Sequence, residues 1–316
     1  MTDRTTSTAT AAAEPATAIT SILMAPSLLL ANGALLALTI IIARLATGHG
    51  APMLWFLTWV MTGAGLILLF AAFATGNATG GWRRRTIYSI GAGAFQAATM
   101  AMAFLSVGYV GAGYISLVFA FPLLATYALA LAVRMERFSA LRTLGVTVGL
   151  MGGLMIASAK FTGLAGVENV GWVLVATAIP LVISAGNLYR TKFWPGDAPP
   201  VLLAALMLLF AAAITGPVAA VTESIAALSH PLSDPTLLTL TGLNIAAFAL
   251  KFVVYFKLQR TAGPVYLSQI GSVGAAFGIP VSVLLLGESL PDGFAIAALL
   301  VVAGAVLFQL SQKPAK

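Results

Sequence analysis

Ten apolar runs, each about twenty residues long, constrain this chain more than any other feature of its sequence. A helix needs about 20 apolar residues to cross the hydrocarbon of a bilayer. Only helices or closed barrels can satisfy their backbone polar groups there. The sequence therefore predicts an all-α integral membrane protein with ten transmembrane helices. The predicted spans are residues 22–43, 52–73, 86–107, 111–133, 140–159, 170–189, 200–221, 236–257, 264–286 and 293–311.

The composition excludes several other classes of protein. Only 8% of the residues are charged and 60% are hydrophobic, whereas soluble domains carry roughly 25% charged residues. The absence of cysteine excludes disulfides, thiolate metal sites and cysteine nucleophiles. His49 and His230 both fall in predicted loops, so we expect no metal site, no cofactor and no catalytic residues. The net charge of +7 does not indicate nucleic-acid binding, because the bases lie in short loops between apolar runs.

The distribution of Lys and Arg predicts the orientation of the chain in the membrane. With the N-terminus placed in the cytoplasm, thirteen of the sixteen bases fall on the cytoplasmic side. Arg44 and Lys160 fall outside, and Lys251 lies within a span. This bias follows the positive-inside rule and predicts a multi-pass inner-membrane protein with both termini in the cytoplasm. Residues 1–21 and 312–316 are predicted to be cytoplasmic tails, the first of them disordered.

The two halves of the sequence share a short pattern at a shift of 152 residues. The matching pairs are Gly111 and Gly263, Tyr114 and Tyr266, Ser116 and Ser268, and Glu136 and Glu288. Each copy falls on the fourth helix of a predicted five-helix unit, at residues 22–160 and 168–311. Because five is odd, the second unit must be inverted in the membrane. Inverted repeats are typical of secondary transporters that bind substrate near the midplane.

Two segments of the sequence resemble a known family. The stretch "GYISLVFAFPLLATYALALAVRMERF" and the later stretch "GPVYLSQIGSVGAAFGIPVSVLLLGESL" are similar to the two half-domains of the drug/metabolite transporter superfamily, EamA branch. The likeness extends over roughly residues 22–311. It implies a ten-helix efflux permease for small metabolites, often amino acids. The Trp-Gly pair common in the first helix of this family is replaced here by Asn32–Gly33.

Three amides lie near the middle of predicted spans, namely Asn32, Gln96 and Asn244. An unpaired amide in hydrocarbon costs several kcal/mol, so each must meet another helix, a cavity or a substrate. Two interpretations remain open. The amides either form hydrogen bonds between helices or line one central cavity between the two halves.

Lys251 is the only base well inside a predicted span. At helical spacing it shares a face with Asn244, Phe248 and Tyr255, and this mixed polar face favours substrate binding. We expect Lys251 to bind an anionic group, such as a carboxylate. The alternative is a side chain that extends to the inner headgroups. No Asp or Glu lies deep in a span, which disfavours an organic-cation exporter and favours a neutral, zwitterionic or anionic substrate.

Tyr114 and Tyr266 fall near opposite ends of equivalent spans, so we expect them, with Ser116 and Ser268, to be gate residues. An ordinary interfacial role is the alternative. Small residues recur on predicted helix 140–159, and they predict close helix packing within a monomer or a homodimer through this helix. These residues are Gly145, Gly149 and Gly153.

The sequence favours one class of function and leaves a second open. The leading hypothesis is a secondary active or facilitative transporter that exports a small metabolite by alternating access through the lipid bilayer. A non-transporting scaffold or receptor subunit remains an alternative. A membrane enzyme acting on lipids would need clustered acids, histidines or a nucleophile at the interface, and the sequence offers none.

Overall fold

The computed structural model describes residues 14–76, 81–132, 138–163, 167–196, 198–267, 269–290 and 293–310, and its regular elements in this part of the chain are all helical. A short 3-10 turn, Ile225–Ser229, precedes α9. The α-helices are α1 (Glu14–Gly48), α2 (Met53–Ala74), α3 (Trp82–Val110), α4 (Ala112–Val118), α5 (Pro122–Ala132), α6 (Ala140–Gly163), α7 (Val167–Lys192), α8 (Pro200–Thr222), α9 (His230–Ser233), α10 (Pro235–Leu267), α11 (Ile270–Leu286) and α12 (Phe294–Leu310).

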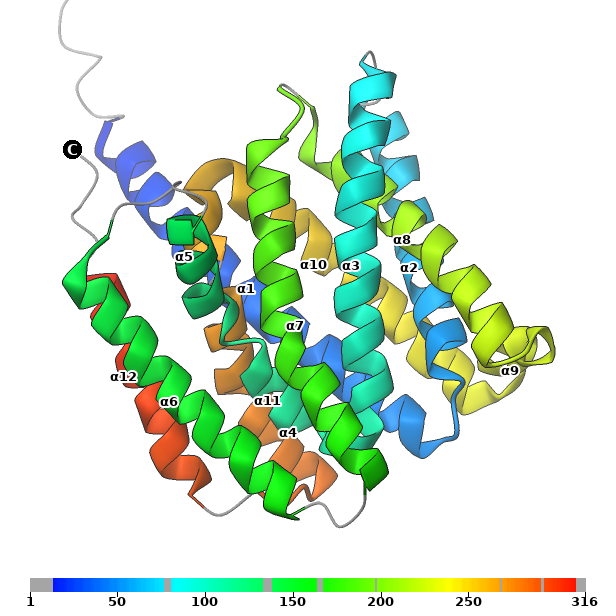
Figure 1. Ribbon diagram of the computed structural model, residues 1–316. Helices are drawn as coiled ribbons and strands as arrows, with labels where there is room; N and C mark the ends of the chain where they lie inside the picture. The colour runs from blue at the N-terminus through cyan, green and yellow to red at the C-terminus, as the bar shows by residue number, and fades with distance from the viewer. Residues whose placement is uncertain are drawn as a thin grey trace, which may run out of the picture.

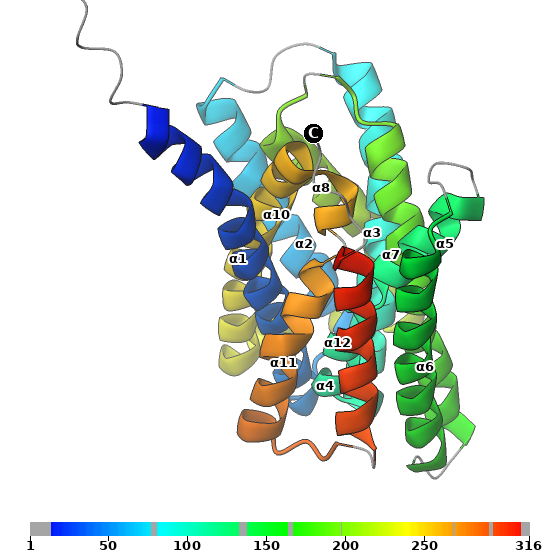
Figure 2. The ribbon, with the colours of Figure 1, turned by 90° about the vertical axis from the view of Figure 1, so that its left-hand side faces the viewer.

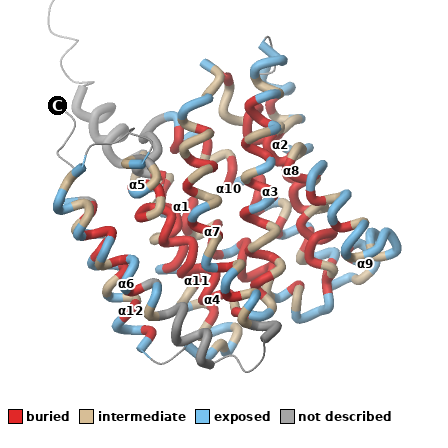
Figure 3. Tube along the Cα trace, in the orientation of Figure 1, coloured by how far each residue is buried: buried red, intermediate tan, exposed pale blue. Residues whose placement is uncertain are grey.

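The helices are long and apolar enough for a multi-pass membrane protein. Within the described residues, seven stretches are long and apolar enough to cross a membrane. They are Ala25–Gly48, Met53–Ala74, Trp82–Val110, Ala112–Leu129, Val170–Lys192, Pro200–Thr222 and Pro235–Arg260. Three shorter apolar helices, Ala140–Gly152, Ile270–Leu286 and Phe294–Phe308, coincide with the remaining predicted spans. Exposed residues on the outer faces of the bundle include many large apolar side chains, as a lipid-facing surface requires (Figure 3).

The helices form one bundle with two distinct ends (Figures 1 and 2). We call one the basic end, where α3 starts with Arg83, Arg84 and Arg85 and α7 finishes at Lys192. The start of α1 and the end of α12 lie at this end. We call the other the acidic end, because the described carboxylates of Glu223, Asp234 and Glu288 follow or precede helix termini there.

Small residues allow α6 and α12 to pack with their backbones close together. A methyl group added at Gly304 would lie 2.5 Å from the carbonyl oxygen of Gly145 and 2.6 Å from the backbone nitrogen of Gly149. The predicted close packing is therefore confirmed for Gly145 and Gly149. Because α12 covers this stripe within one chain, a homodimer would have to use another surface. The surroundings of Gly153 lie outside the described residues.

The predicted span 111–133 is two helices rather than one. α4 ends at Val118, a turn occupies residues 119–121, and α5 starts at Pro122. Proline has no backbone N–H and suits the first turn of a helix, so it favours a break at this point. Gly271 of α11 packs directly against the backbone of Phe119, within the turn between α4 and α5. This contact leaves no room for a side chain at Gly271.

Two predicted boundaries were wrong. α10 continues to Leu267 and α11 begins at Ile270, so residues 264–267 do not belong to the ninth span as predicted. Leu258 and Gln259 are buried, and this packing extends the helix beyond residue 257. At the N-terminus, α1 already begins at Glu14, so residues 14–21 are helical instead of disordered. Pro15 sits at the first helical turn, where proline is favoured. Residues 1–13 and 312–316 lie outside the described residues.

Candidate functional site

A cavity of about 80 Å³ lies inside the bundle, beside the break between α4 and α5. It contains side chains from the last turn of α7 and the later part of α10, so it lies toward the basic end. Its lining residues are Asn32, Leu36, Gln96, Thr99, Met100, Phe119, Pro122, Ile183, Asn187, Arg190, Lys251, Phe252, Tyr255, Leu267, Ile270 and Gly271.

Lys251 is buried in the wall of this cavity, with 3% of its surface exposed. Its ammonium lies 3.9 Å from the ring centroid of Phe248 and 4.7 Å from that of Phe252. Aromatic faces stabilise a cation by about 0.5–2 kcal/mol, less than full hydration would. Among the described residues no carboxylate pairs with this ammonium. Asn32 donates its amide N–H to the Lys251 carbonyl oxygen at 2.8 Å and so joins α1 to α10 at this level.

Arg190 is a second buried base in the same cavity. Its Nη2 donates to Oδ1 of Asn187 at 2.8 Å, and the Tyr255 hydroxyl donates to the same oxygen at 2.9 Å. The guanidinium lies 5.5 Å from the ring centroid of Tyr255. Asn187 and Arg190 are three residues apart on α7 and therefore share a face. This arrangement holds the guanidinium against α10 without a carboxylate from the described residues.

The cavity has more hydrogen-bond donors than its own acceptors satisfy. Nε2 of Gln96 and Nε of Arg190 are buried and have no hydrogen-bond partner among the described residues. Oδ1 of Asn187 already accepts two bonds. A buried donor without a partner costs about 1–3 kcal/mol, so this cavity suits a ligand rich in acceptor atoms.

The structure gathers four of the six predicted substrate-binding residues in one cavity, namely Asn32, Gln96, Lys251 and Tyr255. The other two, Phe248 and Asn244, lie outside it. Phe248 is fully buried, and its ring packs edge to face on Phe104, with the ring planes at 87°. The cavity therefore ends before this level of α10. Asn244, the third amide predicted to line the cavity, is not among its lining residues and is buried with neither amide atom paired among the described residues.

Asn187 and Arg190 were missed by the sequence analysis. The sixth predicted span, 170–189, ended at residue 189 and so assigned Arg190 to a loop. α7 in fact runs to Lys192 and carries Arg190 into the bundle. The three-residue spacing of an amide and a base near a span end was the signal that could have indicated a polar helix face.

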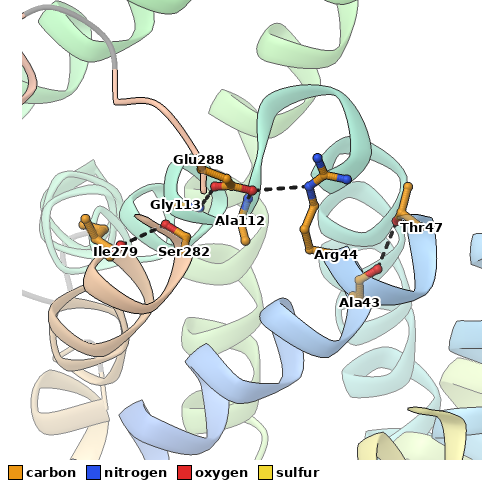
Figure 4. Close-up of polar contacts among 8 residues, drawn as sticks. All are labelled: Ala43, Arg44, Thr47, Ala112, Gly113, Ile279, Ser282 and Glu288. Carbon is orange, nitrogen blue, oxygen red and sulfur yellow. Dashed lines mark hydrogen bonds and ion pairs between the residues drawn. The ribbon is translucent and has the colours of Figure 1, made fainter. Parts of the chain in front are cut away.

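A cluster at the acidic end connects three helices through one carboxylate, that of Glu288 (Figure 4). This carboxylate accepts hydrogen bonds from the backbone N–H groups of Ala112 and Gly113, at 2.8 and 2.9 Å, at the start of α4. It also pairs with Nε of Arg44 from α1 at 3.3 Å. The start of a helix favours a negative charge, so one residue after α11 joins α4 and α1.

The predicted gate residues have different outcomes. Tyr114 lines a cavity of about 300 Å³ beside the Glu288 cluster, and its hydroxyl lies 3.0 Å from Oγ1 of Thr177. Ser116 is buried against Gly278 of α11, and its hydroxyl has no partner among the described residues. Tyr266 belongs to α10, but its side chain lies outside the description, as does Ser268.

The comparisons with known proteins give the fold but no family. No protein-family profile and no curated protein matches the chain. Fifteen chains of solved structures match it. One is a crystal structure described only as that of a protein; it has a TM-score of 0.60 and 22% sequence identity over 94% of this chain and 99% of its own. The fold of this chain is therefore similar to that of an experimentally solved protein over nearly the whole of both. Within the described residues, no group of three His, Cys, Asp or Glu side chains could hold a metal ion.

Proposed function

We propose that this chain is a secondary transporter that carries a small anionic or zwitterionic metabolite across the inner membrane, as an EamA-type permease does. The observation that carries the proposal is the pair of buried bases, Lys251 and Arg190, in one cavity of a multi-pass membrane bundle. Ionisable residues inside a membrane bundle are expensive and mark substrate or ion pathways. A structural role alone would not require two buried bases without a carboxylate partner among the described residues.

Ten spans in two inverted repeats are part of this proposal, and the helix contacts support them. Suppose that α1, α2 and α3 are equivalent to α7, α8 and α10. A contact between two of these helices should then recur between their two equivalents. α1 packs on α10 as α7 packs on α3, and α2 packs on α10 as α8 packs on α3. Phe119 and Gly271, which are 152 residues apart, meet where α11 crosses the α4–α5 break. Equivalent positions of two repeats are expected to meet in this way on the two-fold axis that relates the repeats.

The cavity around Lys251 and the Glu288 cluster support an alternating-access mechanism. The cavity with Lys251 lies toward the basic end, whereas Glu288 joins α1, α4 and α11 at the acidic end. With the basic end in the cytoplasm, this conformation receives substrate from inside and is closed outside. Transport then requires the contacts of Glu288 to break while the basic end closes, which releases the solute outward.

Counterflow in liposomes tests this proposal. Purified protein is reconstituted into liposomes loaded with a mixture of unlabelled amino and organic acids, and uptake of each labelled counterpart is followed. We expect at least one anionic or zwitterionic solute to accumulate transiently above equilibrium, and Lys251→Met to abolish this. Folded protein that exchanges none of these solutes would instead support a scaffold or receptor subunit.

A further inference from the structure

The cavity around Lys251 carries a formal charge of +2. Three of its lining residues are titratable, namely Lys251, Arg190 and Tyr255. The Tyr255 hydroxyl donates a hydrogen bond to Oδ1 of Asn187 at 2.9 Å, which leaves the two bases as the charged groups of the lining. Both bases are almost completely buried, and each lies against an aromatic ring of α10.

The helices around the cavity supply no negative charge to balance these bases. The sequence contains no Asp or Glu from 15–135, 169–196 or 235–287. These ranges contain the buried lengths of α1, α3, α4, α5, α7, α10 and α11. An uncompensated buried charge is costly, because neither hydration nor an ion pair offsets its desolvation. An anion that enters the cavity would supply this compensation.

We propose that the site binds a compact dianion, with Lys251 and Arg190 each neutralising one negative charge. A monoanion would leave one buried base uncompensated, and a neutral solute would leave both. The unpaired donors Gln96 Nε2 and Arg190 Nε add hydrogen bonds that only acceptor oxygens satisfy. This inference rests on the proposed transport site and narrows its substrate class.

The size of the cavity indicates which dianions fit. Its volume is about 80 Å³, and each water-sized position needs about 10–15 Å³ of such volume. Roughly five to eight positions are therefore available. A short dicarboxylate or a tetrahedral oxyanion has this number of non-hydrogen atoms. Both present two negative charges on oxygen, which is the chemistry that the two bases recognise.

Equilibrium binding to the purified protein in lipid nanodiscs tests the charge preference directly. Succinate, its monoamide succinamate and its diamide succinamide differ in charge at nearly constant shape. Sulfate and methanesulfonate form a second pair. We expect the dianion of at least one pair to bind at least tenfold more tightly than its monoanion. The pair that shows this preference distinguishes a dicarboxylate from a tetrahedral oxyanion. Equal affinities within both pairs, or no binding of any probe, would overturn the proposal.

Variants of the two bases test their roles. Arg190→Gln and Lys251→Gln should each bind succinate and succinamate, or sulfate and methanesulfonate, within about twofold of each other. Arg190→Lys keeps the charge and should keep the preference. Lys192→Gln and Lys257→Gln remove exposed bases from the same two helices and serve as matched controls. An unchanged preference in folded Arg190→Gln would overturn the pairing of Arg190 with the second charge.

These experiments test the dianion site and the proposed transport separately. Selective dianion binding without counterflow would contradict the proposed transport but retain the dianion site. Counterflow of zwitterionic amino acids alone, with equal binding within both probe pairs, would retain transport and overturn the dianion site. The wild-type measurements suffice for either conclusion, even if a variant does not fold.

Discussion

The two bases of the cavity are held in different ways. Arg190 is oriented by a hydrogen bond to Asn187, which Tyr255 also contacts, whereas the Lys251 ammonium meets only aromatic rings among its described neighbours. A guanidinium fixed by its neighbours provides a preorganised site, and a compact ammonium on a flexible stem can follow a ligand. We therefore expect the charge of Lys251 to be essential for transport but unimportant for the stability of the folded state.

Lys251→Met tests this division. The change preserves length and apolar bulk but removes the charge, so we expect the transport rate to fall at least tenfold. The thermal unfolding midpoint should not decrease, because removing an uncompensated buried charge costs the folded state little. Lys251→Arg should retain partial activity. Counterflow and thermal unfolding are measured together, with Lys257→Met as the control. Transport at the parental rate in Lys251→Met would make Lys251 only an anchor that reaches toward the headgroups.

The sequence could identify individual polar residues but not the depth of the cavity. Asn32, Gln96 and Lys251 stood out because polar groups are rare in apolar spans, and all three line the cavity. Asn244 had the same signal but does not line the cavity; one turn further along α10, the Phe248 ring closes against Phe104. Such closure depends on side chains from different helices, which helical spacing along one helix cannot predict.

At the scale of elements, two carboxylates at the acidic end bind helix starts in the same way but connect different partners. Glu223 accepts from the backbone N–H groups of Leu54 and Trp55 at 2.9 and 3.0 Å, at the start of α2. Glu288 does so for α4 and also holds Arg44 of α1. The described contacts of Glu223 join α8 to α2, whereas those of Glu288 join the end of α11 to both α4 and α1, where the proposed closure lies. Comparing the two carboxylates therefore separates helix stabilisation from gating.

Glu288→Gln should open the acidic end. The amide cannot accept both backbone N–H bonds, and it loses the ion pair with Arg44. The chain contains no cysteine, so Ser282→Cys, next to Gly113 in the closed contact, provides a single reporter. We expect at least threefold faster labelling of this cysteine by a membrane-impermeant maleimide applied from outside.

Glu223→Gln is the matched control for this experiment. It should lower the thermal unfolding midpoint, because an N-terminal carboxylate contact contributes about 0.5–2 kcal/mol, without changing the labelling rate. Equal labelling rates in the parent and Glu288→Gln would show that Glu288 stabilises α4 but does not hold the closure.

The break between α4 and α5 was only partly predictable from the sequence. Pro122 lies within the predicted span 111–133, and the chain breaks immediately before it. Gly271 has a role that its local sequence does not indicate. Its role depends on Phe119, whose backbone meets it at the crossing of α11 with the break. A contact between residues 152 positions apart follows from the fold and not from either local sequence.

At the scale of the whole molecule, hydrophobic runs predicted the all-α membrane class, because lipid restricts spanning segments so strongly. The helix boundaries were less predictable. α10 extends through residues that read as a loop, since Leu258 and Gln259 are buried by neighbouring helices. The asymmetric distribution of charge predicts the orientation of the chain on a different basis. It reflects insertion into the membrane and does not depend on the internal packing of the bundle.

Cysteine labelling in intact cells tests the proposed orientation of the bundle. His49 follows α1 at the acidic end, and Lys192 ends α7 at the basic end; both are exposed. If the basic end is cytoplasmic, a membrane-impermeant maleimide should label His49→Cys in intact cells and Lys192→Cys only after permeabilisation. A cysteine added after residue 316 should behave as Lys192→Cys does, because the proposed ten spans would place both termini on the same side. The natural absence of cysteine keeps the background low. Labelling of Lys192→Cys in intact cells would reverse the orientation, whereas labelling of the added cysteine alone would require an odd number of spans after α7.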